Sequence, residues 1–125
     1  MYLYYGLEQF LIDKEIEILK KQNNIEDIDV IKYDLENTKI ENVLEDALSI
    51  SLFGNKKLII VENAYIFTGT INKKLIEQNI DILKEYINNG SFNNIIVFTI
   101  IKEKIDERKN IVKLIKEKGV VKDFN

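Results

Sequence analysis

The chain has 125 residues, 46% hydrophobic and 31% charged, a length and balance that predict one globular domain spanning residues 1–125. Cysteine and histidine are both absent, which excludes disulfides, thiolate nucleophiles, imidazole bases and ordinary zinc sites. The 21 acidic and 18 basic residues are interspersed, a pattern that does not favour direct binding to nucleic acid.

The first half of the chain alternates between predicted strands and helices. A short run of aromatic and aliphatic residues predicts a strand at 2–5, and an amphipathic stretch predicts a helix at 10–22. A second strand is expected at 28–33, a second helix at 40–48 and a third strand at 58–61. The order strand, helix, strand, helix, strand is typical of a parallel sheet.

The second half continues this alternation after an irregular stretch. Residues 65–74 fit no regular period, and we expect a surface loop there. A helix at 80–88, a strand at 95–101, a helix at 107–118 and a weaker strand at 120–124 follow. The sequence therefore predicts an α/β fold of three layers, with about five parallel strands and helices on both faces.

Helix ends are marked by short local signals. Thr38 and Glu41 have the spacing of a capping box, in which two side chains satisfy each other's free backbone amides. Gly90 and Gly119 each follow a predicted helix, where a left-handed glycine often ends the helical hydrogen bonding.

The turn after the first strand is the usual place for a phosphate-binding loop in a sheet of this kind. Such a loop needs a second glycine, a lysine and a serine or threonine, but the places counted from Gly6 hold Leu11, Ile12 and Asp13. We expect no nucleotide or other cofactor here, and we expect Phe10, Leu11 and Ile12 to pack the first helix onto the sheet.

Two other functions remain open from the residues alone. A divergent nucleotide-using enzyme could act through Glu62 and Asn63, which follow the third strand. A signalling receiver could use Glu62 as an acidic mimic of a phosphorylated aspartate, with Thr99 as its hydroxyl partner. Receivers place paired acids after the first strand, however, and that place holds Tyr5 and Gly6.

The segment Ser51-Leu52-Phe53-Gly54 sets two large apolar side chains among turn residues. One interpretation is that Leu52 and Phe53 tuck beneath the loop as a satellite of the core. The other is an exposed apolar wedge that enters a groove on a partner protein.

Several segments, in this order and spacing, resemble the first domain of the delta subunit of the bacterial DNA polymerase III clamp loader. The resemblance runs from residue 2 to residue 125. The segments that carry it are Tyr5-Gly6-x-Glu8-x-Phe10-Leu11-Ile12, Ser51-Leu52-Phe53-Gly54, Lys57-Leu58-Ile59-Ile60-Val61-x-Asn63-Ala64, Ile105-Asp106-x-Arg108-Lys109 and Gly119-Val120-Val121-x-x-Phe124.

The resemblance implies a degenerate, AAA+-like version of the phosphate-loop fold that does not bind or hydrolyse ATP. It implies a non-catalytic subunit whose Leu52 and Phe53, flanked by Ser51 and Gly54, enter a groove on the beta sliding clamp and favour the opened ring. Other loader subunits would bind through a collar that, with a helical lid, lies outside this chain. The start of the chain lacks a basic leader, so we expect a cytoplasmic protein with no membrane partner.

Overall fold

The computed structural model describes residues 1–50, 54–90 and 92–125. Within them, five strands form one parallel sheet in the order β2-β3-β4-β1-β5. The predicted strands are therefore confirmed, each within two residues of its expected ends. Their bounds are β1 Tyr2–Tyr5, β2 Val30–Asp34, β3 Leu58–Glu62, β4 Ile95–Ile100 and β5 Val120–Asp123.

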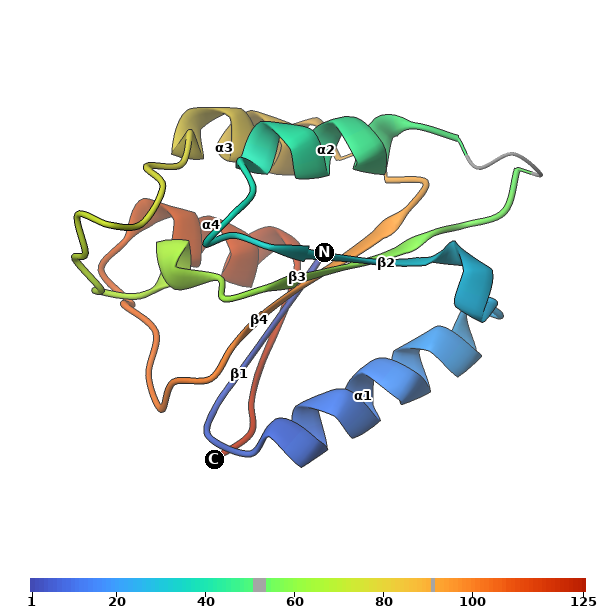
Figure 1. The fold of residues 1–125 in the computed structure, drawn as a ribbon, viewed down its shortest axis with the longest axis horizontal. Helices are drawn as coiled ribbons and strands as arrows, with labels where there is room; N and C mark the ends of the chain where they lie inside the picture. The colour runs from blue at the N-terminus through green and yellow to red at the C-terminus, as the bar shows by residue number, and fades with distance from the viewer. Residues whose placement is uncertain (51–53, 91) are drawn as a thin grey trace.

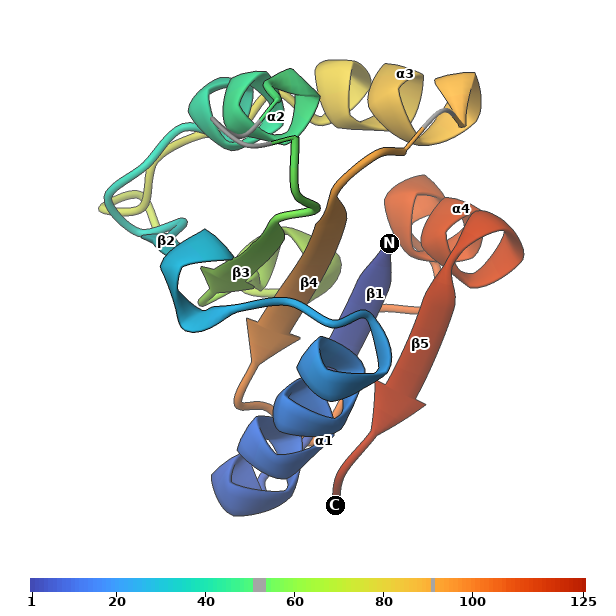
Figure 2. The ribbon, with the colours of Figure 1, turned by 90° about the vertical axis from the view of Figure 1, so that its right-hand side faces the viewer.

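Helices cover both faces of this sheet, which confirms the predicted three layers. Helix α1 (Gln9–Gln22) lies alone on one face, and α2 (Ile40–Leu48), α3 (Ile80–Asn89) and α4 (Asn110–Lys118) lie on the other (Figures 1 and 2). Strand β4 is the middle strand of the sheet, with β3 and β1 beside it and β2 and β5 at the two edges.

Two apolar cores result, one on each side of the sheet. The larger core joins α2, α3 and α4 to the sheet and contains the edge-to-face pair Phe67 and Phe98, with ring centroids 5.1 Å apart. The smaller core lies under α1 and includes Ile12, Ile16 and Tyr4. Strands β3 and β4 contribute to both cores, which explains why their sequences are apolar on successive residues.

Residues 65–74 are only partly the surface loop that the sequence predicts. Their first three residues form a short 3-10 helix, Tyr65–Phe67, and Ile66, Phe67 and Thr68 are buried. The Phe67 carbonyl accepts a hydrogen bond from the Asp106 amide at 2.9 Å. A single 3-10 turn is too short to show a periodic pattern of apolar residues, so the sequence did not predict that it packs into the core.

The predicted capping box is wrong, because α2 begins one residue later than that motif requires. Lys39 occupies the cap position without a side-chain hydrogen bond, and the Ile40 amide donates instead to Gln78 Oε1 at 2.7 Å. Gly90 does end α3 in the left-handed region, at φ 63°. Gly119 is extended, at φ −123°, and a Cβ there would lie 2.5 Å from the Met1 carbonyl oxygen.

The packing expected of the first turn of α1 is also only partly correct. Ile12 is fully buried, but Phe10 and Leu11 are 74% and 43% exposed. The helix presents one narrow face to the sheet, and only every third or fourth residue lies on it. In the described residues, no helix is long and apolar enough to cross a membrane.

Candidate functional site

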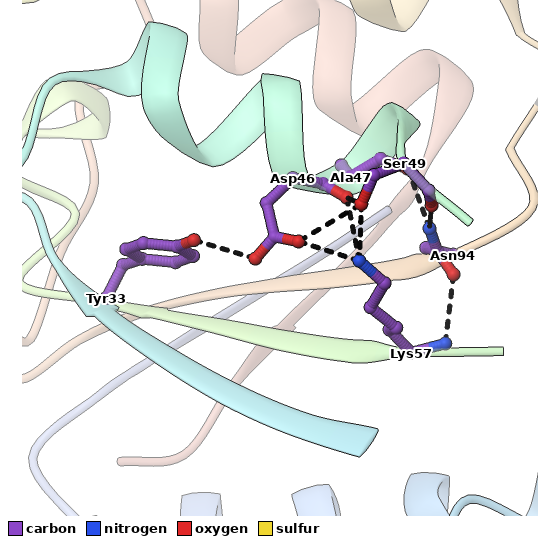
Figure 3. Close-up of polar contacts among 6 residues, drawn as sticks. All are labelled: Tyr33, Asp46, Ala47, Ser49, Lys57 and Asn94. Carbon is purple, nitrogen blue, oxygen red and sulfur yellow. Dashed lines mark hydrogen bonds and ion pairs between the residues drawn. The ribbon is translucent and has the colours of Figure 1, made fainter. Parts of the chain in front are cut away.

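The segment singled out by the sequence lies between the end of α2 at Leu48 and the start of β3 at Leu58. Ser51, Leu52 and Phe53 fall outside the described residues. What the structure does describe is how the two ends of the segment are held. The residues that hold them, here called the stem network, are Tyr33, Asp46, Ala47, Ser49, Lys57 and Asn94 (Figure 3).

Asn94 ties the two ends of the segment together. Its side-chain amide donates to the carbonyl oxygens of Ala47 at 2.8 Å and Ser49 at 2.9 Å, on the α2 side. Its side-chain oxygen accepts from the Lys57 amide at 2.9 Å, on the β3 side. Asn94 is buried just before β4, so a side chain from a third element fixes the distance between the two stems.

Lys57 adds an ionic contact to the same stems. Its ammonium group donates to Asp46 Oδ1 at 2.7 Å, to the Asp46 carbonyl oxygen at 3.2 Å and to Ser49 Oγ. The Lys57 side chain is only 9% exposed, so this ion pair is screened less by water than a surface pair. A buried lysine needs such partners, because an unpaired charge in the interior is costly.

Asp46 also binds Tyr33 on the neighbouring edge strand. The Tyr33 hydroxyl donates to Asp46 Oδ2 at 2.7 Å (Figure 3). This hydrogen bond, with partial burial, raises the pKa of Tyr33 to about 12. Partial burial by itself would raise the pKa of Asp46, but hydrogen bonds from Lys57, Tyr33 and Ser49 outweigh it and hold that pKa below its ordinary value.

Two apolar residues on the α2 side of the segment are open to solvent. Leu48 and Ile50 are 68% and 79% exposed. Gly54 is exposed as well, with φ 72°, and nothing lies within 4 Å of a Cβ built on it. The stem network therefore holds a short segment whose described neighbours face water on both sides of residues 51–53.

The turn at Gly6 is held by hydrogen bonds to other parts of the protein. Its backbone amides already donate within the protein: Gly6 to the Ile100 carbonyl at 3.3 Å, Leu7 to Asn125 Oδ1 at 3.1 Å and Glu8 to the Phe124 carbonyl at 3.0 Å. A phosphate loop works by turning such amides toward the ligand. Here Phe124 and Asn125, which follow β5, accept two of these hydrogen bonds.

The acidic residue at the end of β3 lies in a polar cleft between α1 and the sheet. Glu62 and Thr99 both line this cleft, together with Asp13. Asn63 is turned toward β2 and donates to Asp34 Oδ1 at 3.0 Å. Within the described ranges, no group of three or more acidic side chains is arranged to hold a metal ion.

Sequence reasoning did not identify the stem network. Lys57 stands out in retrospect, because it is a charged residue directly before a strand buried on both faces. Asn94 gives no such signal, since it sits in a polar turn like other asparagines of this chain. Its partners are 37 to 47 positions away, so only the folded sheet brings them together.

Comparison with known proteins agrees with the fold and with the order of the segments. The family model described as "DNA polymerase III, delta subunit" matches residues 2–125. The chain is 29% identical over 120 residues to DNA polymerase III subunit delta of Bacillus subtilis (strain 168), covering 94% of this chain and 35% of that protein.

A solved structure is also similar. The chain matches "Bacillus subtilis DNA clamp loader delta protein (YqeN)" with a TM-score of 0.86 and 27% identity. The match covers 98% of this chain and 37% of the other. This chain thus spans little more than a third of the length of each relative.

Proposed function

Because the chain belongs to the DNA polymerase III delta subunit family, a clamp-loader family of DNA replication, we propose that it is a non-catalytic domain that binds the sliding clamp and opens it. In this proposal, residues 1–125 are a degenerate AAA+-like domain. Contacts with other loader subunits belong to parts of the family beyond this match, and the domain itself contributes no ATP chemistry.

The stem network is the observation that carries the proposal. A hot spot at an interface works best when its anchor is held in place before binding, because less conformational entropy is then lost. Asn94 and Lys57 fix both ends of the segment that contains Leu52 and Phe53. The exposed neighbours Leu48 and Ile50 are consistent with a surface that meets a partner.

In this proposal the clamp opens because the domain binds the opened ring more tightly than the closed ring. Burying Leu52 and Phe53 in a groove would contribute about 1.5–3 kcal/mol for each side chain. If that groove fits the wedge better in the opened ring than in the closed ring, binding shifts the population toward the opened ring. Positioning by the stem network requires no nucleotide.

The double substitution Leu52→Ala and Phe53→Ala tests the binding role. We expect affinity for the cognate clamp, measured by surface plasmon resonance, to fall by at least roughly thirtyfold, because two hot-spot side chains are lost. The matched control is Ile28→Ala with Ile71→Ala, which removes two highly exposed isoleucines far from the segment in sequence. That control should bind like the unmodified protein.

Thermal unfolding of the same variants separates the two interpretations of Leu52 and Phe53. If they form a wedge, the double variant loses affinity and keeps its melting temperature. If they belong to the core, it loses about 2–5 kcal/mol of stability for each truncation. Unchanged affinity for the clamp would end the proposal.

A further inference from the structure

A groove of about 560 Å³ lies between α2 and α3, on the sheet face opposite α1. The two helices run side by side in both views (Figures 1 and 2). Leu44 and Leu48 line it from α2, and Tyr86 and Phe92 line it from α3 and the residues after it. The rings of Tyr86 and Phe92 contact each other with centroids 5.1 Å apart.

The rim of this groove is acidic. Glu41 and Glu45 project from α2, and Glu85 projects from α3. Helix α2 contains no lysine or arginine, and its third acid, Asp46, is already paired with Lys57. Across the described parts of the chain, no ion pair includes any of the three rim glutamates. Their charge is therefore available to a ligand.

We propose that this groove binds an amphipathic protein segment that inserts large apolar side chains and carries lysine or arginine beside them. The apolar lining favours aromatic or leucine anchors, since burying such side chains is the main source of affinity in helix-lined grooves. The three rim carboxylates favour a basic flank. The same charges repel nucleic acid and anionic membranes, which leaves a protein as the occupant.

The described lining of the groove lies beside the flanks of the segment at residues 51–54. Leu48 is the last residue of α2, and the exposed Ile50 follows it toward the segment. At the other side, Phe92 stands two positions before Asn94, which binds the Ser49 carbonyl. The described lining by itself carries the inference, which therefore does not rest on clamp binding.

A tryptophan peptide provides the probe, because this chain contains no tryptophan. We would use a synthetic amphipathic peptide with tryptophan and leucine on one face and lysines beside them. Its twin carries glutamate in place of each lysine. Binding to the full chain is read from the blue shift of tryptophan fluorescence, and we expect it for the lysine peptide only.

Two sets of substitutions locate the binding site. Leu48→Asn should weaken the lysine peptide roughly tenfold, whereas Phe10→Asn, at another exposed apolar side chain, should not. Replacing Glu41, Glu45 and Glu85 together by glutamine should weaken binding of the lysine peptide roughly fivefold and reduce the salt dependence of that binding.

A matched charge control replaces three exposed glutamates outside the groove, Glu36, Glu103 and Glu117, by glutamine. This variant has the same net charge as the rim variant and should bind the lysine peptide normally. Each variant is first checked for an unchanged melting temperature, and both sets change mainly solvent-facing side chains.

Three results would overturn the inference. Equal binding of the two peptides would show that the rim charges do not select the ligand. Equal weakening by the rim and control glutamate sets would show only a net-charge effect. Loss of binding in the Leu52→Ala and Phe53→Ala variant, with Leu48→Asn unaffected, would place the peptide on the segment at residues 51–54 instead.

Discussion

Asp46 is the residue on which the contacts around the segment converge. Its carboxylate accepts from Lys57 at one oxygen and from Tyr33 at the other, and its carbonyl oxygen also accepts from Lys57. The side chain is 19% exposed, so these bonds are stronger than the same contacts would be at a fully hydrated surface. Asp46 thereby links an edge strand, a helix and the start of β3.

Replacing Asp46 by asparagine should lower the free energy of unfolding by about 2 kcal/mol at neutral pH, because Lys57 loses its ionic partner while it stays buried. The folded-state pKa of Asp46 is depressed. Its stabilising contribution is therefore present above the unfolded-state pKa of about 4 and is lost as the pH falls through the lower folded-state value.

Urea unfolding of both proteins over a pH series provides the measurement. The stability difference should be constant near neutral pH and shrink in acid as the carboxyl group protonates. A difference that stays constant into strong acid would contradict a charged Asp46 as the origin of the effect. Glu36→Gln, at an exposed acid outside the network, serves as the control.

At the scale of elements, the turn between β1 and α1 is closed by Phe124, which directly follows β5. Gly6 has φ 141°, and a Cβ built on it would lie 2.4 Å from the Phe124 carbonyl oxygen. The ring of Phe124 in turn contacts Tyr4 in the smaller core, with centroids 5.4 Å apart. Glycine is needed here for close packing against the protein's own backbone as well as for its conformation.

We expect Gly6→Ala to destabilise the protein by about 2 kcal/mol or more, since the new methyl group meets backbone that cannot rotate away. Gly54→Ala is the matched comparison, because Gly54 also has a positive φ but has open space around its Cβ position. At Gly54 the alanine substitution would cost only backbone strain, about 1 kcal/mol. Chemical denaturation of the two variants measures the difference, and equal losses would rule out the steric contact.

At the scale of the whole molecule, the carboxyl ends of β1 and β4 are where an open parallel sheet normally binds ligands. In this protein that edge is occupied by its own chain. Residues 124 and 125 supply hydrogen-bond acceptors to the turn after β1, and the Gly6 amide donates to the end of β4. Apolar side chains are exposed both beside this turn, at Leu7 and Phe10, and around α2 and α3 on the sheet face opposite α1.

Magnesium-ATP should therefore leave the melting temperature of the protein unchanged, even at millimolar concentration. A nucleotide bound at a hundred times its dissociation constant would stabilise the folded state by about 2.7 kcal/mol, a shift of several degrees. Differential scanning fluorimetry with magnesium-ATP, and with magnesium chloride alone as the control, makes the comparison. A rise seen only with the nucleotide would favour an enzyme that acts through Glu62.

The sequence by itself determined the elements and their layering, because apolar runs and helical periods are local patterns. The tertiary structure decided the contacts between residues far apart. Gln78 caps α2 from 38 positions away, and Asn94, just before β4, joins Ala47 in α2 to Lys57 directly before β3. Such partners leave no periodic pattern in the sequence, since each bond joins one polar side chain to backbone groups that only the folded chain brings near it. The residues after Gly6 predicted from the sequence that the turn lacks a phosphate cradle, but the packing of Phe124 against that turn required the fold.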